Sequence, residues 1–280
     1  MHFVKMEGCG NDYIYVDLEQ ETVDNPQSLA RKISDRHFGV GSDGLILIGP
    51  SVRADCRMEM YNADGSRGKM CGNGVRCVAR YLYDYKKIRK PQICVETDSG
   101  IHEVHILEET EKATVRMGKP IIERPDHVIS MEGQKTRMTV VSMGNPHAVV
   151  FMTPEEGSWK NWDMKKASVI STHSDFPDGV NVELVQVYSE TGMKIRVWER
   201  GSQETLSCGS GACAAAAAAI LQGRTKRKVN VEMPGGMLEV EWKTDGELYL
   251  TGSCHIVCEG EYPGQAAEES RENRREKAWY

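Results

Sequence analysis

Two cysteines that stand 137 residues apart occupy nearly the same local sequence. Cys71 begins the run Cys-Gly-Asn-Gly, and Cys208 begins the run Cys-Gly-Ser-Gly. Helix-forming residues follow both runs, and after Cys208 they are mostly alanines. The first amide groups of a helix have no partner inside it, so such a helix start binds anions and lowers the pKa of a cysteine beside it. We therefore expect two activated thiols.

The two thiols together could carry out a reaction that neither could carry out alone. A duplicated fold brings equivalent loops together across a pseudo-twofold interface, so we expect Cys71 and Cys208 to face each other across a cleft. One thiolate would remove a proton from one face of a carbon, and the opposite thiol would protonate the other face, which inverts the configuration. Backbone amides at both helix starts would hold the substrate carboxylate, where negative charge accumulates: those of Gly72, Asn73, Gly209 and Ser210.

The sequence predicts no cofactor for this chemistry. No lysine stands in a phosphate-binding context that would suit a pyridoxal Schiff base, so carbanionic charge has to be stabilised by electrostatics. The spacing Cys254-x-x-x-Cys258 is similar to that of a metal-ligand pair. Residues of one strand alternate between its two faces, and no second ligand pair stands at zinc spacing, so we expect no metal there.

The segments around each cysteine are duplicated as well. Residues 58–61 precede Cys71 at the offset at which residues 195–198 precede Cys208, and alternating strands follow each helix over 93–117 and 229–251. This order predicts an α+β fold of two pseudo-symmetric domains, each a mostly antiparallel or mixed β-sheet wrapped around a central helix.

The duplication also predicts where the chain divides. We expect an N-terminal half over residues 1–118, which carries Cys71, and a C-terminal half over residues 119–258, which carries Cys208, with the active site in the cleft between them. A tail over residues 259–280 would pack near the first half or be exposed. Residues 265–280 are rich in Glu and Arg with few apolar anchors, which predicts an exposed tail or a surface helix.

Composition narrows the class of protein. The chain has 280 residues, a formal net charge of −6 and 40% hydrophobic residues, and it has no basic stripe, which argues against a nucleic-acid partner. It has no apolar window long enough for a membrane span and no basic, then apolar, N-terminal segment, so we expect a cytoplasmic protein. Nine cysteines, an odd number, are expected to be free thiols in a reducing compartment.

Two polar residues in turns fit more than one role. Asn11 follows a glycine between two strands, where asparagine also adopts the left-handed conformation, so it fits both a plain turn and a ligand contact. His147 stands in the equivalent turn of the second half, directly after Asn145 and Pro146. A structural role and a place in the site both remain open for it.

Six motifs in order resemble the diaminopimelate epimerase family over nearly the whole chain: Gly10-Asn11-Asp12, Asn62-Ala63-Asp64-Gly65-Ser66, Cys71-Gly72-Asn73-Gly74-Val75-Arg76-Cys77, Gly144-Asn145-Pro146-His147, Glu199-Arg200-Gly201 and Cys208-Gly209-Ser210-Gly211-Ala212-Cys213. The resemblance implies an epimerase, independent of pyridoxal phosphate and metal, that interconverts LL- and meso-2,6-diaminopimelate in lysine and peptidoglycan precursor biosynthesis. It also implies two halves that close over the substrate, with Cys71 and Cys208 as the acid/base pair.

The same resemblance implies roles for further residues. His147 and Glu199 would tune the cysteine pair. Substrate would be bound by Asn11, Asn62, Gly72, Asn73, Asn145, Asn181, Glu199, Arg200, Gly209 and Ser210. A glutamate and an arginine flanked by amide side chains suit the distal ammonium and carboxylate of diaminopimelate.

The sequence departs from the family pattern at a few positions. Cys9 and Tyr13 stand where members often carry a plain hydrophobic residue and Phe, and Gly44 stands where some carry Gln. The tail also extends past the usual end. Of these departures, Gly44 bears on the expected site because it removes one side-chain contact.

Two other functions remain open from the sequence. A related cofactor-independent racemase of proline, hydroxyproline or histidine would share the two-cysteine chemistry and differ in the distal pocket. A redox-switch protein would instead join Cys71 and Cys208 in a reversible disulfide. For the epimerase and for the related racemase, the partner is a small-molecule substrate. The sequence leaves both a monomer and a homodimer open.

Overall fold

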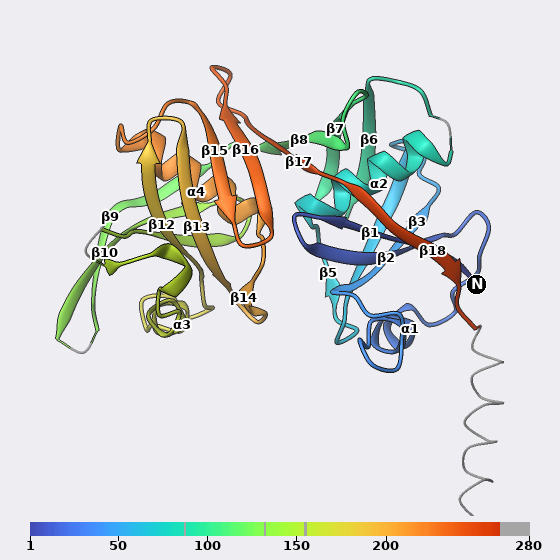
Figure 1. The fold of residues 1–280 in the computed structure, drawn as a ribbon, viewed down its shortest axis with the longest axis horizontal. Coiled ribbons are helices and arrows are strands. Elements are labelled where there is room, and N and C mark those ends of the chain that lie inside the picture. Colours follow the sequence, from blue (N-terminus) through green and yellow to red (C-terminus); the bar gives the residue numbers. More distant parts are fainter. Residues whose placement is uncertain (87, 132, 154–155, 264–280) are drawn as a thin grey trace, which may run out of the picture.

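The computed structural model describes residues 1–86, 88–131, 133–153 and 156–263 and consists mainly of strands (Figure 1). The tail expected at 265–280 lies outside the described residues. The elements from residue 2 to residue 118 are β1 (His2–Gly8), β2 (Asn11–Asp17), α1 (Pro26–Ile33), β3 (Gly44–Gly49), β4 (Cys56–Asn62), β5 (Arg67–Gly68), α2 (Gly72–Asp84), β6 (Gln92–Thr97), β7 (Gly100–Leu107) and β8 (Lys112–Gly118). The elements from residue 121 to residue 261 are β9 (Ile121–Met131), β10 (Gln134–Ser142), β11 (Pro146–Phe151), the short 3-10 helix η2 (Trp159–Asn161), α3 (Lys165–Ser171), β12 (Asn181–Ser189), β13 (Gly192–Glu199), β14 (Gln203–Thr205), α4 (Gly209–Leu221), β15 (Lys228–Met233), β16 (Gly236–Trp242), β17 (Leu248–Ser253) and β18 (His255–Glu261).

Strand pairing repeats between the two halves. In the first half, β2 pairs with β3 in parallel, β3 with β4 antiparallel, β4 with β6 in parallel, and β6, β7 and β8 form antiparallel pairs. In the second half, β11 and β12, β12 and β13, β13 and β15, and then β15, β16 and β17 repeat this order of directions. The repeat confirms the predicted α+β fold with pseudo-symmetric halves.

The two halves are joined by strand β8 of the first and β17 of the second, which lie between them in Figure 1. Thr114 of β8 pairs with Thr251 of β17, and their hydroxyl oxygens lie 2.8 Å apart. Because these threonines are themselves 137 residues apart, the pair lies on the pseudo-twofold axis.

Each half is completed by a strand that follows the other half in the chain. Strand β9 follows β8 and pairs with β10, whereas β18 follows β17 and pairs with β1. Most residues of β9 are exposed or half-buried, so its sequence lacks the apolar alternation by which a strand is recognised. Its place in the sheet is therefore a property of the tertiary structure.

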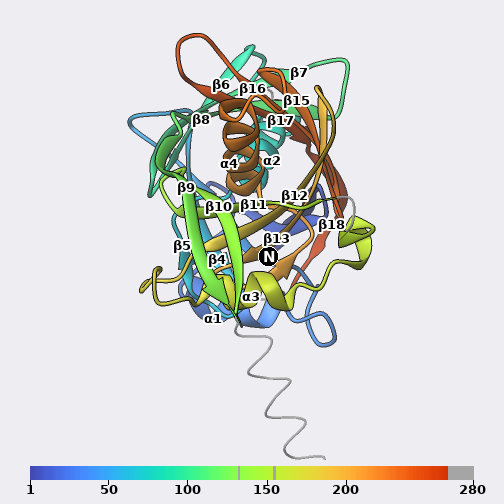
Figure 2. The ribbon, with the colours of Figure 1, turned by 90° about the vertical axis from the view of Figure 1, so that its left-hand side faces the viewer.

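Helices α2 and α4 run through the interior of the two halves, one behind the other in the view of Figure 2. Residues Ala214–Ala219 of α4 are all buried without exposed surface. A helix that is apolar on all sides is typical of a protein core, and alanine side chains let the surrounding strands approach closely. Within the described residues, no helix is long and apolar enough to cross a membrane.

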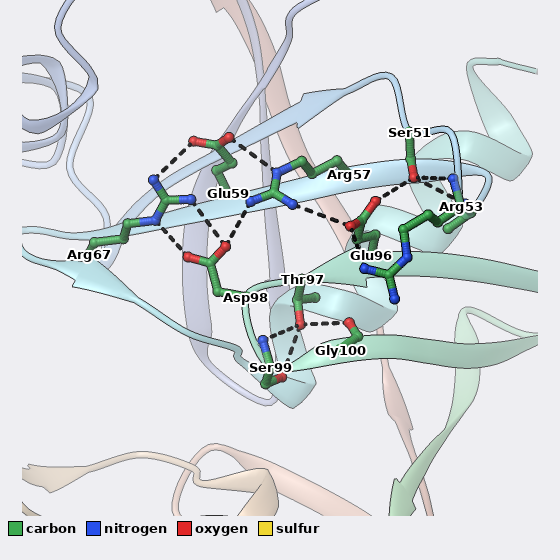
Figure 3. Close-up of polar contacts among 11 residues, drawn as sticks. Ser51, Arg53, Arg57, Glu59, Arg67, Glu96, Thr97, Asp98, Ser99 and Gly100 are labelled. Carbon is green, nitrogen blue, oxygen red and sulfur yellow. Dashed lines mark hydrogen bonds and ion pairs between the residues drawn. The ribbon is translucent and has the colours of Figure 1, made fainter.

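An ion-pair network holds the short strand β5 in place directly ahead of Cys71 (Figure 3). Nε of Arg67 on β5 lies 2.6 Å from Asp98, and Nη2 of Arg57 on β4 lies 2.8 Å from the same carboxylate. Both arginines also reach Glu59, at 3.6 and 3.3 Å. Single surface ion pairs are worth little, but a network that shares its partners fixes the backbone that leads to the thiol.

The equivalent position of the second half carries the opposite charges. Arg196 of β13 pairs with Glu204 of β14 at 2.7 Å, and these two residues correspond to Glu59 and Arg67. The duplication therefore preserves the strand register and the presence of a pair, whereas the sign of each charge has been exchanged.

Buried thiols make the fold sensitive to alkaline pH. Burial raises the pKa of Cys254 from 9.0 to about 11 and that of Cys56 to about 12. A folded pKa above the unfolded value means that the stabilisation is complete below about pH 9 and is lost as the pH rises through the folded values. We expect the free energy of unfolding in urea to be nearly constant from pH 7 to 8.5 and to fall between pH 9 and 11. The Cys254→Ala variant should show a shallower fall, and an equal fall would contradict the assignment.

Candidate active site

The two cysteines of the repeated motif cap the starts of α2 and α4. Cys71 and Cys208 both have extended backbones, and the thiol of each accepts the N–H of the residue three positions on, Gly74 or Gly211, at 3.4 Å. This is the contact that Ser or Asp usually makes at a helix N-cap. Both helices therefore begin where the sequence predicts.

The two helix starts face each other. A Cβ atom placed on Gly209 would lie 3.8 Å from the Cα atom of Gly72. The side chain of Asn73 crosses between the halves and donates from Nδ2 to Ser207 Oγ at 3.0 Å. No hydrogen bond within the described residues uses the N–H of Gly72, Gly209 or Ser210, so these amides are free to hold an anion.

Asn11 organises the surroundings of Cys71. The Cys71 thiol donates to Asn11 Oδ1 at 3.2 Å, and the same oxygen lies 3.4 Å from Nδ2 of Asn73. Nδ2 of Asn11 donates to Asp43 Oδ2 at 2.7 Å, which fixes the orientation of the amide. The sequence offered both a turn and a ligand contact for Asn11, and the structure places it against the first thiol.

The two differences from the family pattern at Tyr13 and Gly44 are structurally connected. Tyr13 pairs with Gly44 across β2 and β3, is buried, and hydrogen-bonds to Asn11. A Cβ atom on Gly44 would lie 2.8 Å from Cε1 of Tyr13 and 2.2 Å from the carbonyl oxygen of Tyr61. A side chain at position 44 is therefore excluded by this backbone, and the phenol ring of Tyr13 fills the space beside it.

Glu199 lies beside Cys208 at the second thiol. Its carboxylate accepts hydrogen bonds from Thr205 and from the Cys208 thiol, and Cys208 also contacts Ser210 Oγ at 3.5 Å. Burial raises the pKa of Glu199, and Glu183 raises it further, against the opposite effects of Thr205, His147 and Cys208.

His147 is fully buried and has two polar partners. Its Nδ1 donates to Glu183 Oε1 at 2.7 Å, and its Nε2 lies 3.1 Å from Asn145 Oδ1. Glu183 is also fully buried and interacts electrostatically with Cys208. The sequence prediction omitted Glu183, although an acidic residue in the apolar run Val182-Glu183-Leu184-Val185 was a signal of a buried polar role.

The expected activation of the thiols differs from what the structure shows. Burial raises the pKa of Cys71, although the N–H groups of Gly74 and Asn73 lower it. Burial, followed by Glu199, raises the pKa of Cys208 well above its usual value. The prediction of a lowered pKa is therefore wrong for this conformation, because loss of hydration outweighs the helix start.

Three further candidates, Asn62, Asn181 and Arg200, form no hydrogen bond with either thiol within the described residues. Asn181 is buried and accepts the backbone N–H of Arg200 at 2.8 Å, while the exposed Arg200 side chain donates to the carbonyl of Asp178 at 2.8 Å. Asn62 donates to Ser66 at 2.9 Å, and within the described residues no hydrogen bond joins it to either thiol. Cys254 is buried and Cys258 is exposed, and the described residues contain no group of side chains arranged to hold a metal ion.

Several solved structures share this fold. A phenazine biosynthesis protein of the PhzF family from Bacillus anthracis superposes with a TM-score of 0.72 at 18% identity, over 94% of this chain and 99% of its own. A hydroxyproline epimerase from Agrobacterium vitis, with bound trans-4-hydroxy-L-proline, gives a TM-score of 0.66 at 16% identity, over 93% and 90%. At these identities the likeness shows the α+β fold of two halves.

Sequence comparison gives a closer relation. Diaminopimelate epimerase from Desulfovibrio desulfuricans is 45% identical, over 94% of this chain and 98% of its own length. The enzyme of that name from Methanococcus maripaludis is 42% identical, over 93% and 99%. The family model described as diaminopimelate epimerase matches residues 3–123 and 139–257, which include both helix starts. The chain belongs to the diaminopimelate epimerase family.

Proposed function

We propose that the protein interconverts LL- and meso-2,6-diaminopimelate, with Cys71 and Cys208 as the acid and the base. The observation that carries this proposal is the pair of thiols at the starts of two facing helices, related by the pseudo-twofold axis of the fold. A substrate carbon between the two helix starts would present opposite faces to the two thiols. Membership of the family supports the choice of diaminopimelate, a precursor of lysine and peptidoglycan.

The two thiols exchange roles with the direction of the reaction. In one direction the thiolate of one cysteine removes the Cα proton, and the thiol of the other protonates the opposite face of the carbanion. The pair is left with its proton moved from one sulfur to the other, so the reverse reaction begins from that state. A single thiol could only return the proton to the face from which it came.

The helix starts stabilise the carbanion. Its charge spreads onto the α-carboxylate, and the free N–H groups of Gly72, Gly209 and Ser210 together with that of Asn73 are the donors that suit this group. Fixed amide donors in a site closed to water cost no reorganisation when the charge develops. They replace the electron sink that a pyridoxal cofactor supplies in other racemases.

The far end of the substrate would be bound by charged and amide side chains around the two helix starts. Diaminopimelate carries a second ammonium and a second carboxylate, which suit the carboxylate of Glu199 and the guanidinium of Arg200. Amide side chains of Asn11, Asn62, Asn145 and Asn181 would complete the hydrogen bonds. The Arg200 side chain is exposed, and within the described residues its guanidinium bonds to a single group, the backbone carbonyl of Asp178, so it can turn toward a ligand at little cost.

The thiols support a reducing compartment for the enzyme. All nine cysteines are free, and an active pair of thiols has to remain reduced, so we place the enzyme in the reducing cytoplasm. A disulfide between Cys71 and Cys208 would remove both acid/base groups and is expected to inactivate the enzyme.

Solvent deuterium incorporation tests the function directly. Reduced protein treated with a chelator is incubated in deuterium oxide with diaminopimelate, lysine, proline, trans-4-hydroxyproline and histidine in separate reactions. We expect Cα deuterium in diaminopimelate alone, measured by mass spectrometry, because only this substrate carries a second zwitterionic centre. Exchange of proline or hydroxyproline in its place would show a related racemase, and exchange of none would refute the proposal.

A further inference from the structure

Glu183 and Ile46 occupy equivalent positions in the two halves, 137 residues apart, on β12 and β3. A Cβ atom on Gly74 would lie 2.8 Å from Ile46 Cδ1, and one on Gly211 would lie 2.7 Å from Glu183 Oε1. Each side chain therefore packs against the first turn of the helix that carries a thiol. The first half places a hydrocarbon there, and the second half places a carboxylate.

The Glu183 carboxylate is enclosed and only half satisfied. It has no exposed surface, and its Oε1 accepts from Nδ1 of His147 at 2.7 Å. Its Oε2 has no hydrogen-bond partner within the described residues. A buried carboxylate oxygen without a partner is costly, and an apolar residue fits the same position in the first half, so packing does not explain Glu183.

The ring at the start of the repeated parallel ladder differs between the halves in the same sense. Tyr13 pairs with Gly44, and His147 pairs with Asn181, at the same step of the repeated parallel ladder. Burial raises the pKa of Tyr13 well above its usual value, so its hydroxyl stays neutral near Cys71. The first half thus places a neutral phenol where the second half places an imidazole bound to a carboxylate.

We propose that Glu183 is a positioning residue that makes Cys208 chemically different from Cys71, through its bond to His147 and its contact with the first turn of α4. The assignment rests on the proposed function only in taking the two thiols as the reacting groups. The titratable groups that face Glu183 are His147 on β11, Glu199 on β13 and Cys208 on α4.

The charge of Glu183 opposes ionisation of Cys208. Burial is the main cause of the raised pKa of Cys208, and Glu199 and Glu183 add to it, so the proton stays on this sulfur. Glu199 also raises the pKa of Cys71, but the guanidinium of Arg76 lowers it and so favours the Cys71 thiolate. On these charges we expect Cys71 to ionise at a lower pH than Cys208.

The test is thiol alkylation as a function of pH in wild type and in the Glu183→Gln variant, without substrate. The amide oxygen of glutamine can still accept from His147, so the variant removes the charge and keeps the shape. Iodoacetamide labelling of Cys71 and Cys208 is quantified separately by peptide mass spectrometry. We expect the midpoint for Cys208 to move down by about one pH unit and that for Cys71 to stay in place.

The matched control is Ile46→Val, which alters packing at the equivalent position without a change of charge and should move neither midpoint. An unchanged midpoint for Cys208, or an equal shift of both thiols, would overturn the proposal. As a second measurement, kcat/KM is followed against pH in both directions of the reaction. The part of the profile that reflects ionisation of Cys208 should lie at lower pH in Glu183→Gln than in wild type. Alkylation needs no substrate, so its midpoints test the role of Glu183 whether or not the protein epimerises diaminopimelate. A failure of the proposed function would appear in the deuterium exchange experiment instead.

Discussion

Replacing either Cys71 or Cys208 with alanine is expected to lower the rate of epimerisation by about 10²–10⁴-fold, because each direction of the reaction needs one thiolate and one thiol. The loss should affect kcat in both directions equally. It is measured by the appearance of the meso isomer from LL-diaminopimelate, and of the LL isomer from meso, with chiral chromatography.

The chain supplies its own matched controls for this experiment. Cys77 and Cys213 lie six and five residues further along the chain, on the same two helices, and are fully buried among apolar residues. Their replacement with alanine removes a sulfur of the same kind from the core and should leave kcat within about threefold of wild type, after allowance for a small loss of stability. Equal losses at all four positions would show that the thiols are structural.

Replacing Arg76 with alanine is expected to lower the free energy of unfolding by about 3–5 kcal/mol. Arg76 lies on α2, has no exposed surface and forms no ion pair within the described residues. Its guanidinium donates to the Ser253 carbonyl at 3.3 Å and to Asn73 Oδ1 at 3.0 Å. The variant would leave these acceptors buried without donors and would open a cavity in the interior.

Two glycines show that the fold is shaped around this side chain. A Cβ atom on Gly8 would lie 3.2 Å from Nη2 of Arg76, and one on Gly252 would lie 2.7 Å from the same atom. Loss of the guanidinium also frees Asn73, which joins the two helix starts through Ser207. We therefore expect activity to fall together with stability in Arg76→Ala.

Arg80 provides the control for Arg76, one turn further along α2. It pairs with Asp84 at 2.6 Å and is partly exposed, so Arg80→Ala should cost less than about 1 kcal/mol. Urea denaturation followed by circular dichroism measures both variants. Similar losses of unfolding free energy in the two variants would show that the buried guanidinium of Arg76 stabilises the fold no more than an exposed arginine on the same helix does.

The repeated local sequence was sufficient to predict the fold class and both helix starts. A cysteine followed by Gly-x-Gly and helix-forming residues specifies a capped helix through contacts within a few residues of each other, so it could be recognised without a structure. The same holds for the alternating strands after each helix. Strand β9 was missed because it is mostly exposed, and its pairing with β10 depends on a sheet built by the rest of the chain.

The pKa values of the thiols could not be predicted in this way. A helix start lowers the pKa of a cysteine by a local effect that is visible in sequence, whereas burial raises it by an amount that depends on every element packed around the site. Glu183 was missed for a related reason. An acidic residue within an apolar strand is visible, but its neighbours His147 and Cys208 come from other elements.

The sequence by itself determined that this protein contains two copies of one unit, each with a thiol at a helix start, because those features depend on contacts close along the chain. Only the tertiary structure decided that the two copies differ. The two helix starts meet across the pseudo-twofold axis, with Tyr13 and Ile46 at the first and Glu183, bonded to His147, at the second. The physical reason is that hydration, charge and packing around a buried thiol are set by residues far apart in sequence, which only the folded chain brings together.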